Sequence, residues 1–124
     1  MTIENVSLPH AEVAPACEEA VALLKRQLAS LEEIAERHYG EVQDQEREWA
    51  FLTEAIVAKC FGADSPQYDK LIRTKSVGTE SVQNRFDGPD YERLQVNFEA
   101  RSRQRKAVLK SLLGELDIRL HLKN

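Results

Sequence analysis

The sequence predicts an all-α protein: an antiparallel helical bundle of long amphipathic helices, with a short helix and loop at residues 62–88. Apolar residues recur at alternating spacings of three and four over long stretches, which is the period of one helix face. Only 5 glycines and 4 prolines interrupt the 124 residues, of which 42% are apolar. This length favours a single domain.

The first 15 residues show no sustained apolar period and contain two prolines, Pro9 and Pro15. They predict an extended or frayed N-terminal arm over residues 1–15, followed by one helical bundle domain over residues 16–124. Pro15 suits the first turn of a helix, because the backbone N–H that proline lacks has no partner there in any case.

A first long helix is expected from about Ala16 to Tyr39. At 1.5 Å per residue it would be ~35 Å long, and so long a stripe needs other helices to cover it. The stripe is built from residues three and four apart: Cys17, Val21, Leu24, Leu28, Leu31, Ala35 and His38.

Gly40 leaves two routes for the chain. A glycine weakens a helix, and the polar run Glu41–Glu48 follows it, which favours a tight turn and an antiparallel second helix. The apolar spacing nevertheless continues in phase through Val42 to Ile56, as it would in one rod from about residue 16 to 61. We prefer the turn, because a single rod would need a partner chain along its whole length.

The segment from Trp49 to Phe61 predicts a second helix with apolar residues on several sides, so we expect it to be central in the bundle. One face carries Trp49, Leu52, Ile56 and Cys60, and Phe51, Ala55 and Val57 flank that face.

A structural junction follows at Phe61, Gly62, Asp64, Ser65 and Pro66. Phe61 is expected to be buried, and Gly62 suits a left-handed helix stop. Asp64 or Ser65 can cap the next helix, and Pro66 presets its first turn, which predicts a helix over 66–73. The Asp–Ser pair could also suggest catalysis, but no histidine is placed near it by sequence. Residues 74–88 predict a loop.

The last helix is expected from just after Pro89 to about Leu120. Two apolar stripes in similar phase are separated by the segment EARSRQRKA, which has no large apolar residue. Residues 93–110 carry only one acidic side chain, Glu99, and six basic ones: Arg93, Arg101, Arg103, Arg105, Lys106 and Lys110.

The basic segment allows two interpretations. Clustered arginines on one helix face suit phosphate or nucleic acid. The net charge of −4, the lack of interleaved aromatics and the lack of a nucleic-acid motif favour pairing with Glu32, Glu33, Glu36 and the Glu41–Glu48 segment instead. Residues 1–60 carry −7 and residues 61–124 carry +3, so the two halves can pair within one fold or between subunits.

Other functions find little support in the sequence. Nucleotide, hydrolase and zinc motifs are absent, the three histidines are far apart, and Cys17 and Cys60 are too few for a disulfide scaffold. We therefore expect no enzyme activity, no cofactor and no metal. No apolar run approaches the ~20 residues that span a bilayer, so a cytoplasmic protein is expected. A small-molecule sensor with a pocket near Trp49 and Tyr68 rests on aromatic density alone.

One resemblance adds to these expectations. A Trp-led apolar helix ending in Phe61-Gly62-x-Asp64-Ser65-Pro66, followed by a loop and a leucine-rich helix, resembles a helical module of bacterial conflict and defence proteins. That module precedes effector domains such as TIR-like domains. The resemblance covers about residues 45–120 and implies a regulatory or self-associating role. It carries over no catalytic residue, and we expect no effector domain within this chain.

The expected function is therefore a non-enzymatic protein–protein interaction or oligomerisation module. Long helices with wide stripes predict a homodimer, with coiled-coil-like packing between copies. A further protein partner is possible on the same grounds. The alternative is binding of nucleic acid or nucleotide phosphate through residues 93–110.

Overall fold

The computed structural model describes the backbone of residues 2–77 and 91–123, and the side chains of residues 18–77 and 91–122. These residues form four α-helices and one short 3-10 helix, in order α1 (Thr2–Ala35), α2 (Tyr39–Phe61), α3 (Pro66–Arg73), η1 (Thr74–Ser76) and α4 (Tyr91–Lys123). The described part of the chain contains no strand. The predicted all-α fold class is confirmed.

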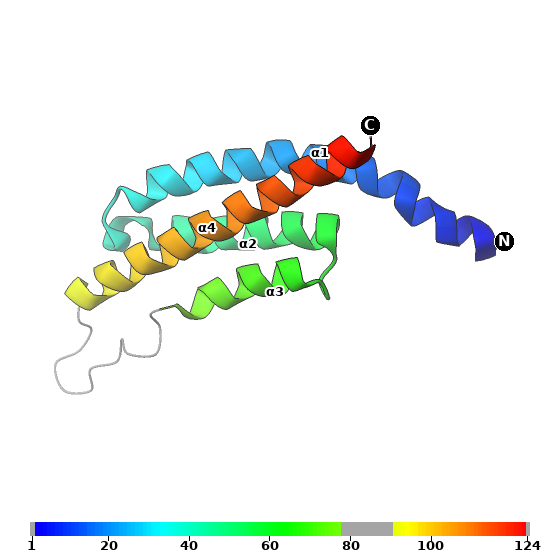
Figure 1. Ribbon diagram of the computed structural model, residues 1–124. Coiled ribbons are helices and arrows are strands. Elements are labelled where there is room, and N and C mark those ends of the chain that lie inside the picture. Colours follow the sequence, from blue (N-terminus) through cyan, green and yellow to red (C-terminus); the bar gives the residue numbers. More distant parts are fainter. Residues whose placement is uncertain (1, 78–90, 124) are drawn as a thin grey trace.

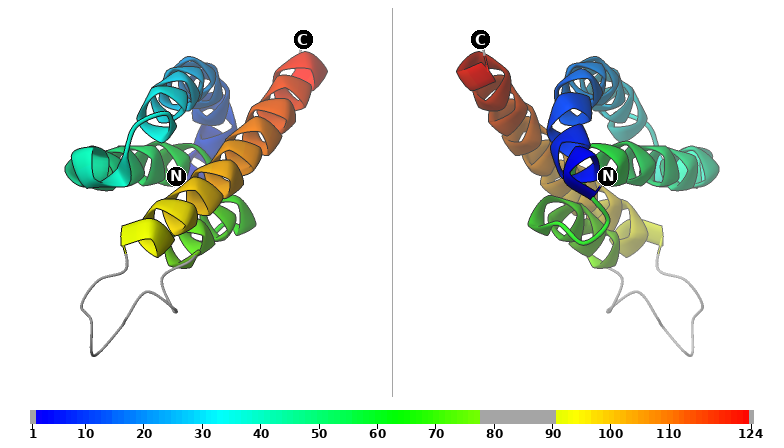
Figure 2. Two further views of the ribbon diagram at one scale, coloured as in Figure 1. Left: turned by 90° about the vertical axis from the view of Figure 1, so that its left-hand side faces the viewer. Right: turned by 90° about the vertical axis from the view of Figure 1, so that its right-hand side faces the viewer.

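Helices α1 and α2 form an antiparallel hairpin, and α4 packs across one face of it (Figure 1). The short helix α3 packs against α2 and α4 at the edge of that layer (Figures 1 and 2). All four helices supply side chains to one core; those with at most 3% exposure include Leu24, Leu31, Trp49, Val57, Leu71, Phe98, Leu109, Leu112 and Leu116.

The N-terminal segment differs from the prediction. Helix α1 begins at Thr2, so the expected extended or frayed conformation of residues 1–15 is wrong. No glycine occurs anywhere in α1, and each proline removes only one backbone donor from a helix that is otherwise continuous. The first part of α1 projects past the ends of the other helices (Figure 1).

The chain turns before Gly40. Helix α1 ends at Ala35 and α2 begins at Tyr39, so the turn is correct and the single rod from 16 to 61 is wrong. Gly40 itself lies in the first turn of α2. The backbone N–H of Tyr39, which has no partner inside its own helix, donates to Oε1 of Gln95 in α4 at 2.7 Å.

The junction at residues 61–66 ends α2 and begins α3 at the predicted positions, but Phe61, which was expected to be buried, is only partly buried. Gly62 ends α2 with a φ of 100°, a conformation that side chains with a Cβ rarely adopt. Ser65 caps α3, because its Oγ accepts a hydrogen bond of 3.0 Å from the backbone N–H of Tyr68. Pro66 is the first residue of that helix, and Asp64 is exposed. Of the predicted loop, residues 74–76 form η1, and residues 78–88 lie outside the described residues.

Helix α2 is less central than its apolar sequence predicts. Phe51 is 70% exposed and Leu52 is 47% exposed, and Ala55 is exposed beside them. The reason is that α1, α3 and α4 cover only part of the circumference of α2. Its remaining surface therefore presents apolar side chains outward.

Candidate functional site

Three charged side chains are buried together where α2 meets α4. Glu46 and Arg101 are each 7% exposed, and Arg105 is 3% exposed. Arg101 donates through Nε to Glu46 Oε2 at 2.7 Å and through Nη2 to Oε1 at 3.0 Å. Arg105 donates through Nη1 to the same Oε2 at 2.8 Å. One carboxylate thus joins two arginines, which stand four residues apart on α4.

Hydrogen bonds extend this cluster to η1. Arg105 Nε donates to the hydroxyl of Thr74 at 3.1 Å, and that hydroxyl donates to the carbonyl of Leu71 at 2.6 Å. Arg101 Nη1 donates to the carbonyl of Val77 at 3.3 Å. The two arginines therefore tie α2, α4 and the segment after α3 into one network.

Aromatic rings cover the two guanidinium groups. Arg101 lies 5.6 Å from the ring centre of Tyr39, and Arg105 lies 5.5 Å from that of Trp49. Such contacts stabilise a cation that has lost its water. Burial still lowers the pKa of Arg105, with the nearby charge of Arg101 acting in the same direction and Glu46 opposing both.

The predicted basic segment does not act as one surface. Arg101 and Arg105 bind Glu46, and Lys106 Nζ lies 3.0 Å from Glu32 Oε2 in α1. The structure thus brings three of the six cations to carboxylates in the two acidic segments that the sequence singles out. The other three, Arg93, Arg103 and Lys110, have exposed side chains.

A cleft of about 440 Å³ opens beside the buried cluster, between α2, α4 and η1. Arg101, Arg105 and Glu46 form part of its wall, and Arg47 and Lys75 stand at more exposed positions around it. The remaining lining residues are Tyr39, Gln43, Ala50, Leu94 and Asn97.

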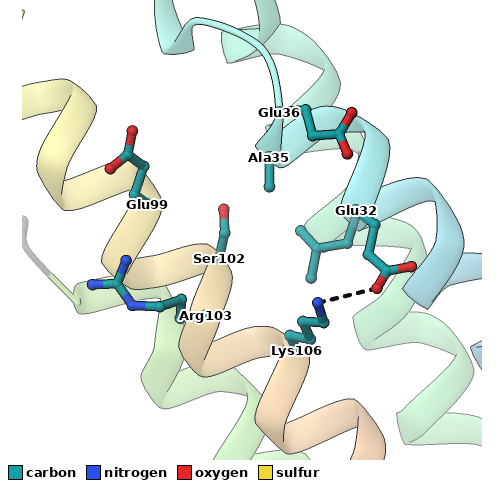
Figure 3. A pocket seen from close by; sticks show the side chains of 8 residues that line it. Glu32, Ala35, Glu36, Glu99, Ser102, Arg103 and Lys106 are labelled. Atoms are coloured by element: carbon teal, nitrogen blue, oxygen red, sulfur yellow. Dashed lines mark ion pairs between the residues drawn. The ribbon is translucent and has the colours of Figure 1, made fainter.

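A second cleft, of about 510 Å³, lies between α1 and α4 (Figure 3). The ion pair of Glu32 and Lys106 stands at one side of it, and Ser102 points into it from α4. Ser102 is 5% exposed, and its hydroxyl has no hydrogen-bond partner among the described residues. A serine nucleophile needs a base within hydrogen-bond reach, so this arrangement suits a polar ligand or an ordered water better than covalent chemistry.

The outward side of α2 carries a regular stripe. Residues at spacings of four and three lie side by side on a helix, and Glu48, Leu52, Ala55 and Lys59 follow this spacing. All four are exposed. Phe51 flanks the stripe on one side. We refer to Glu48, Phe51, Leu52, Ala55 and Lys59 as the α2 stripe.

Two shallow grooves along the α1–α2 hairpin border this stripe. Glu48 and Leu52 line one, and Ala55 and Lys59 line the other, with α1 forming the opposite wall of each. The groove beside Ala55 continues the apolar surface of the α2 stripe to Ala20 and Leu23 of α1, whereas the groove beside Leu52 is lined mostly by polar side chains.

Trp49, near which the sequence suggested a ligand pocket, borders the groove of Glu48 and Leu52 but belongs to the core. Trp49 is 3% exposed, and its indole Nε1 donates to the carbonyl of Gln27 at 2.8 Å. The edge of the indole ring therefore binds that carbonyl, and the guanidinium group of Arg105 lies over its face. The indole thus serves packing between α1, α2 and α4.

Comparison of the chain with protein-family models, curated proteins and solved structures finds no match. Within the described helices, none is long and apolar enough to cross a membrane. The side chains described for 18–77 and 91–122 include no group of three or more His, Cys, Asp or Glu residues that could hold a metal ion.

Sequence reasoning named the Glu41–Glu48 segment as a partner of the basic segment but did not single out Glu46 as the partner of both arginines. A signal was available, since Glu46 lies four residues after Val42 and three before Trp49, on the apolar stripe of its helix. Arg101 and Arg105 likewise occupy the stripe that joins Phe98 to Leu109. Charged residues in core positions of two helices indicate a buried ion cluster.

Proposed function

We propose that this protein is a non-enzymatic self-association module, and that the α1–α2 side of one copy pairs with the same side of a second copy. The observation that carries the proposal is the α2 stripe. Phe51, 70% exposed, and Leu52, 47% exposed, form an outward apolar surface beside the grooves of the hairpin. Apolar side chains grouped on one face mark association sites more often than single exposed ones do.

The order of residues in the α2 stripe suits a second copy of the same chain. Closed homodimers have a twofold axis, so one surface meets itself in reverse. An axis midway between Leu52 and Ala55 places each of these residues opposite the other. Glu48 and Lys59 lie equally far on either side of that midpoint, so the same axis places each carboxylate opposite an ammonium group.

The direct test is the mass in solution of the wild-type chain and of Leu52→Asp, measured by light scattering at micromolar concentration. We expect a wild-type dimer. Burying a leucine contributes about 1.5–3 kcal/mol, and the variant loses this twice, so its dimer should weaken about a hundredfold or more.

Ile118→Asp is the matched control, because Ile118 is 61% exposed on α4, away from the α2 stripe. It should leave the dimer intact. A monomeric wild-type chain at these concentrations, or equal loss of the dimer in both variants, would contradict the proposal.

The resemblance to helical modules of bacterial defence proteins extends the proposal to a regulatory role. Self-association of such a module brings two attached or partner effector domains together. We place this association in the cytoplasm, since two cysteines are too few for the disulfide scaffold of a small secreted domain.

The alternative, nucleic-acid or nucleotide-phosphate binding by the whole segment 93–110, has less support. Nucleic-acid binding relies on several cations that are available to phosphates, whereas Arg101, Arg105 and Lys106 contact carboxylates of this chain. A narrower form of anion binding, at one cleft, is argued next.

A further inference from the structure

The cluster of Glu46, Arg101 and Arg105 carries more positive than negative charge. One carboxylate faces two guanidinium groups, so the three buried side chains sum to +1. An uncompensated charge that has lost its water is costly, and proteins commonly offset it with a partner ion. Burial lowers the pKa of Arg105 below its ordinary value, and the charge of Arg101 acts in the same direction.

The cleft beside the cluster is also positively charged. Of the described residues that line it, four are cations, Arg47, Lys75, Arg101 and Arg105, and one is a carboxylate, Glu46. Two more carboxylates stand nearby: Asp44 lies 3.5 Å from Arg47, and Glu54 lies 3.4 Å from Lys75.

Among the residues that the structure describes, the surroundings of the cleft keep a net charge of +1 even with both neighbouring carboxylates included. The pair of Arg47 with Asp44 is highly exposed, at 78% and 94% of the side chains. A contact this exposed contributes little, so Arg47 can turn to an incoming anion at small cost.

The shape and chemistry of the lining indicate what kind of anion would enter. Guanidinium groups bind phosphate oxygens through paired N–H donors, and the bonds from Arg105 to Glu46 and Thr74 engage two of its five donors. The volume of about 440 Å³ falls in the range of small-molecule pockets and exceeds what a lone phosphate fills. Tyr39, Ala50 and Leu94 supply apolar surface for an organic part.

We propose that the cleft between α2, α4 and η1 binds a small organic phosphate. Its phosphate group lies against Arg101 and Arg105, with Arg47 and Lys75 closing over it. Its organic part lies against Tyr39 and Leu94. Bound there, the anion joins α2 to α4 and the segment after α3, and supplies the negative charge that the buried cluster lacks.

This site is independent of the proposed dimer. Ala50 and Arg47 line the cleft, whereas Leu52 and Lys59 belong to the α2 stripe. Helical spacing places these two pairs on different sides of α2. Phe51 of the stripe is four residues after Arg47 and lies beside it, but Leu52 and Lys59 do not border the cleft. Variants at Leu52 or Lys59 therefore leave the cleft unchanged, and either proposal can fail without the other.

The test is a titration of the full chain followed by amide chemical shifts in NMR. The probes are inorganic phosphate, adenosine monophosphate and adenosine, each up to about 10 mM, which covers the weak affinities expected for small ligands. Sodium chloride at matched ionic strength is the reference. We expect saturable shifts with both phosphates, centred on Arg47, Lys75 and Asn97, with tighter binding of adenosine monophosphate and no saturation by adenosine alone.

The double variant Arg47→Ala/Lys75→Ala removes the two exposed cations and keeps the buried cluster. It should raise both dissociation constants at least tenfold, and Lys110→Ala, an exposed cation outside the cleft, should change neither. The site is overturned if phosphate causes no saturable shift beyond sodium chloride, or if the double variant binds as wild type does. Equal binding of phosphate and adenosine monophosphate would overturn the contribution of the organic part.

Discussion

Glu46 is the residue on which the meeting of α2 and α4 depends most. It accepts three hydrogen bonds from two buried arginines. A buried ion cluster is weak evidence for net stability, but removing one partner leaves a buried charge uncompensated. Removing one member of the cluster therefore lowers the free energy of unfolding by much more than the intact cluster contributes to it.

The variant Glu46→Gln keeps the shape of the side chain and removes its charge. We expect it to lower the free energy of unfolding by about 3 kcal/mol or more, because two guanidinium groups remain buried without a carboxylate. Urea unfolding at one fixed protein concentration measures this. Glu33→Gln, at an exposed position of α1, should stay within about 0.5 kcal/mol of wild type. A loss below about 1 kcal/mol for Glu46→Gln would show that the cluster is solvated.

At the scale of elements, local signals located α3 and the end of α2 correctly. Gly62, Ser65 and Pro66 act through backbone conformation and capping within a few residues, so their effect can be predicted from the sequence. The start of α1 could not be predicted in the same way. Pro9 and Pro15 suggest that the chain is not helical there, but the helix contains both prolines without a break. The start of α2 depends on Gln95, which is 56 residues from Tyr39, and sequence periodicity contains no information about such a contact.

Gly62 and Gly114 offer a matched pair of glycine-to-alanine substitutions. Gly62 has a φ of 100° and a ψ of 146°, a region that is almost confined to glycine, so Gly62→Ala should destabilise the protein by about 1–3 kcal/mol. Gly114 lies inside α4, and a Cβ there would meet nothing within 4 Å. Gly114→Ala should stabilise the protein by about 0.5–1 kcal/mol.

Thermal or urea unfolding of both variants provides the comparison. Opposite signs are the expected result, since the two substitutions differ in backbone conformation and not in chemistry. Destabilisation by Gly114→Ala, or an unchanged stability of Gly62→Ala, would mean that the junction or α4 has a different backbone from the one described.

At the scale of the whole molecule, ion pairs within one chain join the acidic half of the sequence to the basic half. Glu32 and Glu46 belong to the acidic half, and their partners Lys106, Arg101 and Arg105 belong to the basic half. The sequence predicted such pairing as one of two possibilities. It could not choose the partners, because both halves offer several charges in similar positions.

The exposed side of α2 is also a property of the whole molecule. Periodicity predicted its apolar residues correctly but assigned them to a bundle interior. Which of them become buried depends on how many helices surround α2, and the fold provides neighbours on only part of it. The α2 stripe, with Leu52 and Ala55 between Glu48 and Lys59, is what remains uncovered.

The central claim is that this stripe pairs with itself across a twofold axis. Charge exchange tests it most directly, through the dimer dissociation constants of wild type, Glu48→Lys, Lys59→Glu and the double variant in sedimentation equilibrium. Each single variant places like charges opposite one another twice, so we expect dimers weakened about tenfold. The double variant restores opposite charges and should return to within about threefold of wild type. A double variant at least as weak as the single variants would contradict the pairing.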